Sequence, residues 1–248
     1  MAGLDWLTAR PVAHRGLHDA KNGIVENTPS AAAAAVAGNY AIEFDLQITA
    51  DGEAMVYHDD ALGRLTEGSG RIAAMAAADL KRVAFRATAD RMIALGELCE
   101  LVAGRVALVA ELKSHFDGDD RLVRRVIDVL QHYAGPVAVM SFDPAQVAMV
   151  HNLAPGLPRG IAAERWYDHP EWAPLPASKR REMAWFTHAL RTRPHFIAYY
   201  VRDLPATVPL IGRYLFGTPL LTWTVRTDAE RKRATRWADQ MIFEGFRP

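Results

Sequence analysis

Eight short apolar runs are spread along the chain, and helical patterns separate most of them. The runs cover residues 11–13, 41–48, 106–112, 137–140, 159–162, 196–200, 220–225 and 241–243. Runs of this length that are apolar throughout are typical of strands covered on both faces. Strands that alternate with helices favour a parallel sheet. We therefore predict eight parallel strands.

Three of the expected helices carry start signals. These are Thr28 before Pro29, Asp143 with Gln146 three residues later, and Thr227 with Glu230 three residues later. A hydroxyl or carboxylate side chain at the first position accepts a backbone N–H, and the later Glu or Gln completes a capping box. We predict a helix at each signal.

Eight strands at a spacing of about thirty residues fit a closed (β/α)₈ TIM barrel, and a chain of 248 residues suits one domain over residues 1–248. An open doubly wound sheet is the alternative, because the pattern alone does not show closure. No Gly-x-Gly-x-x-Gly fingerprint follows a strand, which disfavours a nucleotide-binding version of that sheet.

Two connections differ from the short loops, about 2 to 6 residues long, that usually join these elements. Residues 51–93 form a long excursion, in which Asp51-Gly52 turns the chain into a short strand at 53–57 that delivers His58 back over the barrel. Residues 164–179 are rich in proline and tryptophan. We expect a surface loop near the mouth of the barrel, acting either as a lid or as an oligomer contact through exposed tryptophans.

Acidic residues interrupt two of the apolar strands. In strand 41–48, side chains alternate between faces, so Glu43 and Asp45 share the face opposite Ile42 and Phe44. Glu111 occupies the corresponding place near the end of strand 106–112. Three acids in such apolar surroundings require an explanation.

A hard divalent cation explains these acids. An unpaired buried carboxylate costs several kcal/mol or more, and oxygen ligands suit Mg²⁺ or Ca²⁺. The alternative is that Glu43, Asp45 and Glu111 are solvated, or paired with Lys113 or Arg15. We favour one cation, because three acids occur together with histidines nearby.

The candidate functional residues lie at the carboxyl ends of the predicted strands, where barrels of this kind have their active sites. His14 and Arg15 follow the first strand, Lys113 follows the third, and His58 arrives from the excursion. Two imidazoles supply a general base and a general acid near neutral pH. Arg15 and Lys113 can hold anionic oxygens. This set suits cleavage of a phosphodiester.

The other candidate residues receive ordinary structural interpretations. Cys99 is the only cysteine, so it forms no intramolecular disulfide, and it reads as a small buried hydrophobe in a helix over 95–103. The remaining histidines are interpreted as surface or core residues: His18, His115, His132, His151, His169, His188 and His195.

The composition limits the classes of partner that we expect. The 29 basic and 29 acidic residues balance, and there is no extended basic block, which argues against a nucleic-acid partner. No leader pattern and no apolar run approaching about 18 residues is present, so we expect a cytoplasmic protein without stable membrane insertion. A small molecule is the expected partner, and a homo-oligomer is left open.

Several of these residues resemble the signature of the glycerophosphodiester phosphodiesterases. The matching segments are Ala13-His14-Arg15-Gly16, Glu26-Asn27-Thr28, Glu43 through Gly52, Val56-Tyr57-His58-Asp59, Glu111-Leu112-Lys113, Ser141-Phe142 and Trp223-Thr224-Val225. They follow in order along nearly the whole chain. Any one of these short segments alone is weak evidence for the family, but the group of segments in the N-terminal half is highly specific.

The resemblance implies a (β/α)₈ barrel that hydrolyses glycerophosphodiesters to glycerol 3-phosphate and an alcohol. It implies that His14 and His58 act as general acid and base. It also implies that Glu43, Asp45 and Glu111 bind one Mg²⁺ or Ca²⁺. A glycerol hydroxyl would attack phosphorus first, and water would then open the cyclic phosphate.

The resemblance also implies a substrate-binding set. Arg15 and Lys113 match residues that contact phosphate, and Trp223 matches one near the glycerol end. Glu26 matches an active-site acid that orients its neighbours or lies close to the metal.

The end of the chain departs from the family pattern. Where an Asp-Gly-Ile-x-Thr-Asp run is common, this chain has residues 238–246, and Arg226 replaces the asparagine that commonly follows Trp-Thr-Val. An added cation there favours a more anionic substrate, a hypothesis that Arg226→Asn would test.

Three other readings share parts of this evidence. A lysophospholipase-D-like or sugar-phosphodiester hydrolase would use the same residues. A catalytically silent barrel acting as a binding protein is disfavoured, because both histidines and all three acids are present. A metal-independent lyase resembling phosphatidylinositol-specific phospholipase C is disfavoured by the same three acids.

Overall fold

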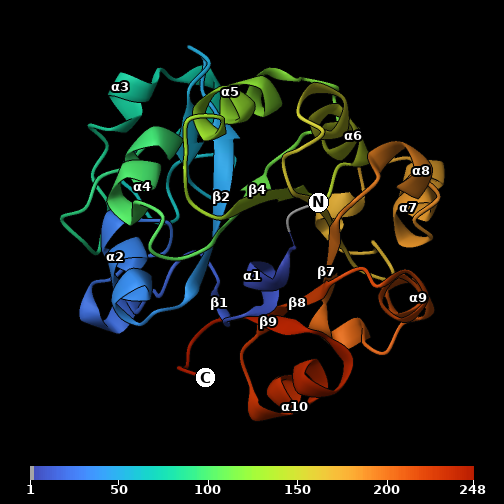
Figure 1. Cartoon of the computed structure of the whole chain (residues 1–248). Helices are drawn as coiled ribbons and strands as arrows, with labels where there is room; N and C mark the ends of the chain where they lie inside the picture. Colours follow the sequence, from blue (N-terminus) through green and yellow to red (C-terminus); the bar gives the residue numbers. More distant parts are fainter. Residues whose placement is uncertain (1–2) are drawn as a thin grey trace.

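Eight parallel strands form a closed barrel in this computed structural model, which describes residues 3–248 (Figure 1). They are β1 (Val12–Ala13), β2 (Ala41–Ile48), β4 (Leu108–Leu112), β5 (Val137–Ser141), β6 (Arg159–Ala163), β7 (Phe196–Tyr200), β8 (Leu220–Val225) and β9 (Gln240–Phe243). Strand β1 pairs with both β2 and β9, which closes the ring. The predicted (β/α)₈ barrel is therefore confirmed, and the open sheet is excluded.

Most of the helices surround this ring, and the first of them lies over its centre (Figure 1). They are α1 (Asp5–Thr8), α2 (Pro29–Ala37), α3 (Ala77–Leu80), α4 (Leu95–Val102), α5 (Arg121–Leu130), α6 (Pro144–Leu153), α7 (Ala177–Ala184), α8 (Ala189–Thr192), α9 (Thr207–Phe216) and α10 (Asp228–Trp237). Short 3₁₀ helices lie at Ala20–Asn22, Ile72–Ala74, Pro170–Trp172 and Val201–Asp203. Within residues 3–248, every helix is too short or too polar to cross a membrane.

The predicted helix starts are largely confirmed. The start of α2 is capped by the expected threonine, and Thr227 forms a full capping box with Glu230 at α10. Asp143 caps α6, but the predicted box at that helix is wrong. Gln146 instead donates to the backbone carbonyl of Lys113 at 3.2 Å. This bond ties α6 to the segment that follows β4.

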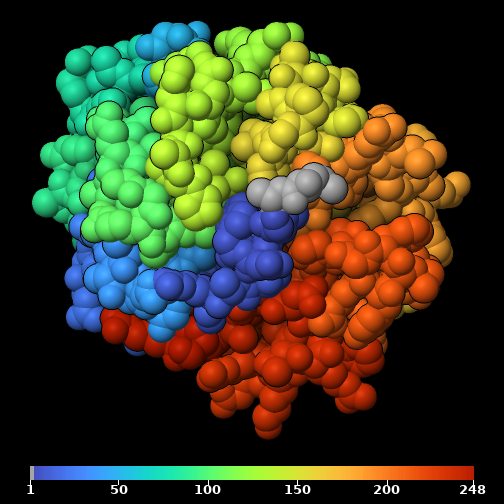
Figure 2. All heavy atoms as spheres, in the orientation of Figure 1, coloured from blue at the N-terminus to red at the C-terminus, as the bar shows by residue number. Residues whose placement is uncertain are grey.

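The side chains of β2 alternate between two faces, as predicted. Ile42, Phe44 and Leu46 pack outward against the helices in the largest apolar cluster. The opposite face points into the barrel, where Val109 packs with residues of other strands and with Leu7 of α1. Helix α1 thus closes the end at which the strands begin, and its atoms lie in the middle of the face seen in Figure 2. The other end is left for the site.

The excursion at 51–93 forms a small layer with its own core. Strand β3 (Ala54–Val56) runs antiparallel to β2, as the predicted turn requires. The layer packs around a separate apolar cluster: Val25, Met55, Tyr57, Leu62, Ile72, Leu80, Phe85, Met92 and Ala94. Immediately after β3, His58 reaches the mouth of the barrel. The predicted delivery of this histidine is confirmed.

The segment 164–179 lies over the same mouth. Trp172 is buried and borders the central cavity, whereas Trp166 is 64 % exposed. The expectation of exposed tryptophans is therefore wrong for Trp172. Its ring packs on Phe116, Phe142 and Tyr167. The segment forms part of the cavity wall.

We predict that Gly16→Ala destabilises the fold by about 2 to 4 kcal/mol. Gly16 has φ +80°, and an added Cβ would lie 2.8 Å from the backbone of Ala31. Gly52→Ala is the matched control, because Gly52 has φ +81° with open space around it, and we expect a cost of about 1 kcal/mol. Denaturant unfolding measures both. Equal losses in the two variants would contradict the packing argument.

Candidate active site

A cavity of about 830 Å³ opens where the barrel strands end. Seven predicted site residues line it: His14, Arg15, Glu43, His58, Glu111, Lys113 and Trp223. Asp45 and Glu26 do not line it. Asp45 is buried behind the lining, and Glu26 is paired with arginines, as described below.

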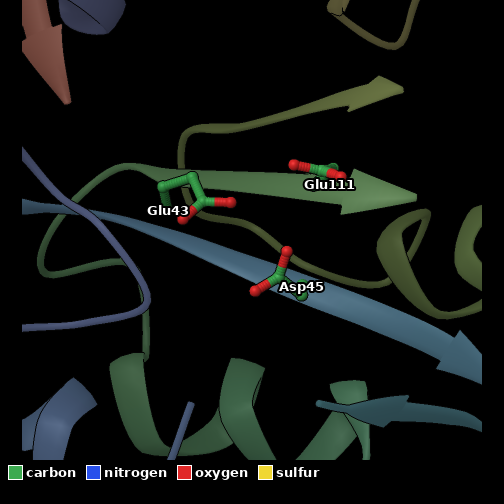
Figure 3. Close-up of side chains that lie close together, drawn as sticks. All are labelled: Glu43, Asp45 and Glu111. Atoms are coloured by element: carbon green, nitrogen blue, oxygen red, sulfur yellow. The ribbon is translucent and has the colours of Figure 1, made fainter. Parts of the chain in front are cut away.

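Three carboxylates converge on two neighbouring strands. Glu43 and Asp45 come from β2, and Glu111 comes from β4, where it is the register partner of Asp45 (Figure 3). One oxygen from each lies within 4.8 Å of the others. The period of two in β2 therefore produces the predicted cluster, and parallel pairing adds its third member.

Two cations compensate part of this negative charge. Lys113 Nζ lies 2.7 Å from Asp45 Oδ1 and 2.6 Å from Glu111 Oε1. Arg15 Nε lies 3.3 Å from Asp45 Oδ2. Burial works to raise the pKa of Asp45, but Lys113, His58 and Arg15 outweigh it and hold that pKa well below its usual value. The alternative of pairing with Lys113 or Arg15 thus holds for Asp45, and Glu111 also pairs with Lys113.

Glu43 is the uncompensated member of the cluster. Its Oε2 accepts the backbone N–H of Arg15 at 3.0 Å, but its Oε1 is buried without any partner among residues 3–248. Burial, with the nearby charges of Asp45 and Glu111, raises the pKa of Glu43 well above its usual value. An orphaned oxygen in an all-carboxylate donor set fits a hard divalent cation.

Unusual backbone geometry aims Arg15 and Asn27 at the cluster. Both have left-handed conformations, with φ 56° and 57°. The Asn27 N–H donates to the carbonyl of Arg15 at 2.9 Å, and the Asn27 side chain donates to Asp45 at 2.8 Å. Strained residues of this kind persist only where their surroundings fix them. Asn27 therefore couples the loop after β1 to strand β2.

His14 is held by an acid that directly follows the last strand of the barrel. Its Nδ1 lies 2.8 Å from Glu244 Oε2, and its Nε2 lies 3.9 Å from Glu43. Burial lowers the pKa of His14 to about 4, against the opposing effect of Glu244. The neutral ring then donates its Nδ1 proton to Glu244 and turns Nε2 toward the carboxylates.

Glu244 is held in turn by Arg226. Arg226 Nη2 donates to Glu244 Oε2 at 2.9 Å. Burial works to raise the pKa of Glu244, but the bonds from His14 and Arg226 lower it to about 2. The cation that Arg226 adds is therefore balanced inside the chain. Arg226 also lines the cavity, so the expectation of a more anionic substrate stays a prediction.

His58 has an equivalent support from the excursion. Its Nδ1 lies 2.8 Å from Asp59 Oδ1, and Arg64 Nε donates to Asp59 at 2.6 Å. Arg64 also binds Glu26 at 2.6 Å, and Glu26 accepts from Arg15 at 2.7 Å. Direct substrate binding by Glu26 is thus not supported. Its carboxylate links two arginines, which agrees with the orienting role that the resemblance also implied.

Sequence reasoning missed the residues behind the histidines. Asp59 follows His58 in a segment that resembles the family signature. Glu244 lies in the C-terminal segment that departs from the family pattern. The sequence positions of both residues could therefore have indicated a role in the site. Arg64 had no such signal, because it lies in an irregular part of the excursion. Only folding brings Glu244 to His14 and Arg64 to Asp59.

An aromatic wall faces the carboxylate cluster across the cavity. Phe142 packs on Trp223 at 5.3 Å and on Trp172 at 5.2 Å, and Tyr200 packs on Trp223 at 5.1 Å. Glu164, directly after β6, lies in this wall. Burial raises the pKa of Glu164 to about 7, although the nearby Trp172 indole acts in the opposite direction.

The residues set aside in the sequence mostly lie away from this chemistry. Cys99 is buried in α4, as predicted, and burial raises its pKa to about 11. His188 is buried against Thr192. His115 and His169 border the cavity. Of these two, His115 pairs with Asp60 at 3.1 Å.

The comparison with family models identifies the chain. Residues 14–246 match the model of the "Glycerophosphoryl diester phosphodiesterase family". The chain belongs to this family. The resemblance seen in the sequence is thereby confirmed, and the protein is a phosphoric diester hydrolase, as predicted.

Related members of the glycerophosphoryl diester phosphodiesterase family span most of the chain. A glycerophosphodiester phosphodiesterase of Caldanaerobacter subterraneus subsp. tengcongensis is 28 % identical, covering 89 % of this chain and 88 % of the relative. One from Bacillus subtilis is 24 % identical over 83 % of this chain and 73 % of the relative.

Solved structures share the fold. A phosphodiesterase of Oleispira antarctica, described in complex with the product sn-glycerol-3-phosphate, has a TM-score of 0.77 at 19 % identity, covering 96 % of this chain and 94 % of that one. A glycerophosphoryl diester phosphodiesterase from Silicibacter pomeroyi has a TM-score of 0.77 at 25 % identity, covering 94 % and 89 %.

We predict that Glu164 makes the protein less stable as pH rises. Its folded pKa of about 7 exceeds the unfolded value of 4.5, so the native state binds the proton more tightly. The free energy of unfolding should fall between about pH 4.5 and pH 7, by up to about 3 kcal/mol. Glu164→Gln removes this loss, and urea unfolding at pH 4.5 and pH 8 measures it.

Asp168→Asn is the matched control, because Asp168 is an exposed acid of the same segment. It should keep the wild-type pH dependence of unfolding. A Glu164→Gln variant with that same dependence would refute the assignment of the loss to Glu164.

Proposed function

We propose that the protein hydrolyses glycerophosphodiesters to glycerol 3-phosphate and an alcohol, with His14 and His58 as the general base and acid. One observation carries the proposal. Each histidine lies at the same cavity with its Nδ1 held by a carboxylate, and each carboxylate is held by an arginine. General acid–base catalysis needs such fixed imidazoles.

The hydrogen bonds define which nitrogen reacts. Because Glu244 accepts the Nδ1 proton of His14, Nε2 of the neutral ring carries the lone pair. This nitrogen takes the proton from the attacking glycerol hydroxyl, and the oxygen attacks phosphorus. His58 gives a proton to the departing alkoxide. Water then opens the cyclic phosphate, with the histidines in exchanged roles.

The remaining charged residues bind the phosphate. Arg15 and Lys113 line the cavity beside the carboxylates, and both keep positive charge, because neighbouring acids outweigh burial and raise their pKa values. Glu43, Asp45 and Glu111 would hold one Mg²⁺ or Ca²⁺, which when bound stabilises negative charge on the phosphodiester oxygens. Trp223 would contact the glycerol end.

The named relatives support this substrate class. Those from Caldanaerobacter and Bacillus are called glycerophosphodiester phosphodiesterases, and the Oleispira structure is described with glycerol 3-phosphate as product. The cavity volume lies within the range of about 300 to 1,000 Å³ that is usual for small-molecule sites.

We expect glycerol 3-phosphate to be released from a panel of glycerophosphodiesters with Mg²⁺ or Ca²⁺, and release to stop with EDTA. His14→Ala and Glu43→Ala should each lower kcat/KM at least about 100-fold, because one removes a proton-transfer group and the other a cation ligand. An enzyme-coupled assay of glycerol 3-phosphate measures this.

Asp168→Asn serves as the control, and it should retain wild-type turnover. Absence of turnover with either metal, in a protein shown to be folded, would overturn the proposal. A catalytically silent barrel acting as a binding protein would then be the preferred interpretation.

Glu244→Leu should lower kcat about 10- to 100-fold while leaving KM nearly unchanged. The leucine accepts no proton from His14 Nδ1, so the ring loses its fixed orientation. Glu244→Gln keeps an acceptor oxygen and should lie between the wild type and the leucine variant. Steady-state kinetics on one diester distinguishes these cases. A raised KM with unchanged kcat would instead place Glu244 in substrate binding.

A further inference from the structure

The exposed apolar side chains of this protein gather on one part of the chain. Within residues 3–248, most of the large hydrophobic residues that are exposed lie between 177 and 216: Trp185, Leu190, Ile211, Tyr214, Leu215 and Phe216. Elsewhere in the described part of the chain, only Leu153 and Trp166 are comparable. Leu190 is 90 % exposed and Phe216 is 77 % exposed, so these side chains do not serve the core.

The helices that carry these side chains are neighbours. Arg191 of α8 pairs with Glu182 of α7. Phe186, which lies between α7 and α8, and Leu210 of α9 pack against the same apolar cluster. The three helices lie along one edge of the molecule (Figure 1). We call their exposed surface, with the six residues named first above, the helical face. An apolar group of this kind marks a contact site.

The helical face lies away from the mouth of the cavity. Helix α8 leads into β7 and α9 leads into β8, and these two strands are paired. Leu190 and Phe216 therefore lie near the end of the barrel at which the strands begin, whereas the cavity opens where the strands end. A partner bound to this face would leave the cavity accessible.

An excess of positive charge accompanies the helical face. Residues 177–216 contain two acids, Glu182 and Asp203, and seven basic residues: Lys179, Arg180, Arg181, Arg191, Arg193, Arg202 and Arg213. The whole chain is neutral, with 29 basic and 29 acidic residues, so the excess is local. Arg202 and Arg213 pair with acids of later segments. Arg181 and Arg193 are exposed and form no ion pair within residues 3–248.

The charge of Arg193 is reinforced from below. Arg159 is buried at the start of β6, where its Nε donates to the carbonyl of Thr192 at 3.0 Å and its Nη2 lies 3.0 Å from His151 Nδ1. Burial and the charge of Arg193 lower the pKa of Arg159. Two arginines without a carboxylate partner thus lie beside α8, and an anion placed there would stabilise both.

An anionic lipid surface matches both properties of the helical face. Aromatic and leucine side chains enter the boundary between headgroups and acyl chains, while arginines reach the lipid phosphates. A second copy of the chain matches only the apolar side chains, because a two-fold contact through this face would bring two positive surfaces together.

We propose that the helical face docks the protein reversibly on an anionic lipid surface. The contact is peripheral, and it needs no helix that spans the bilayer. The mouth of the cavity stays open to water while the protein is bound. This inference does not depend on the proposed function, because binding is measured without turnover.

Vesicle sedimentation tests the docking directly. The intact protein is mixed with vesicles of phosphatidylcholine alone, or with vesicles in which roughly one third of the lipid is phosphatidylglycerol. Binding to the anionic vesicles should be at least about tenfold tighter, and about 0.5 M salt should remove most of the difference by screening. No binding to anionic vesicles at low salt, or equal binding to both kinds, would overturn the proposal.

The apolar contribution is tested by a double variant. Leu215→Ser combined with Phe216→Ser should weaken binding to anionic vesicles at least about tenfold, because both side chains are exposed and bury apolar area only on the membrane. Trp166→Ser removes an exposed aromatic ring from outside the helical face and should bind as the wild type does. An equal loss in this control would contradict the assignment to the face.

The charged contribution is tested in the same way. Arg181→Gln combined with Arg193→Gln should weaken binding about tenfold. Arg82→Gln combined with Arg91→Gln removes the same charge from two exposed positions of the excursion and should leave binding unchanged. Equal losses in the two double variants would show that net charge alone decides binding. Urea unfolding verifies that every variant is folded.

Light scattering tests the alternative occupant. Without vesicles, the wild type should not associate through this face. A dimer that becomes a monomer in the variant combining Leu215→Ser with Phe216→Ser would assign the helical face to self-association and overturn the proposal.

Discussion

The burial of three carboxylates on the neighbouring strands β2 and β4 is the constraint on which the site depends. Such a cluster is tolerable only if cations are fixed beside it. Lys113 comes from the residue after β4, and Arg15 from the loop after β1. The pairing of β1 with β2 that closes the barrel also brings Arg15 to Asp45. Closure of the barrel and the pairing of Arg15 with Asp45 thus depend on the same strand pairing.

The same logic extends outward in two chains of alternating charge. Arg226 and Glu244 support His14, while Arg64 and Asp59 support His58, and Glu26 joins the second chain to Arg15. Each histidine is therefore fixed from behind, with Nδ1 occupied. Asp59 and Arg226 line the cavity, so these chains also form part of its wall.

Local sequence rules predicted the parts of the molecule in which neighbours along the chain decide the outcome. The period of two in 41–48 placed Glu43 and Asp45 on one face, and the alternation of strands and helices gave the barrel. The capping signal at Asp143 failed in part, because Gln146 is drawn to the carbonyl of Lys113 by packing between elements. That contact has no local sequence signature.

Long-range pairs account for the rest of what sequence did not reveal. Glu244 meets His14 across 230 positions, and Arg64 meets Glu26 across 38. The burial of Trp172 was also not predicted, because a segment rich in proline and tryptophan is typical of a surface loop.

The separate core of the excursion has a consequence for how the site is maintained. His58, Asp59 and Arg64 belong to a layer that packs around its own apolar cluster, whereas His14 belongs to the barrel. Local opening of that layer would remove one histidine while leaving the barrel intact. Because the proposed catalytic pair draws on two separate apolar clusters, opening of either one would leave the site incomplete.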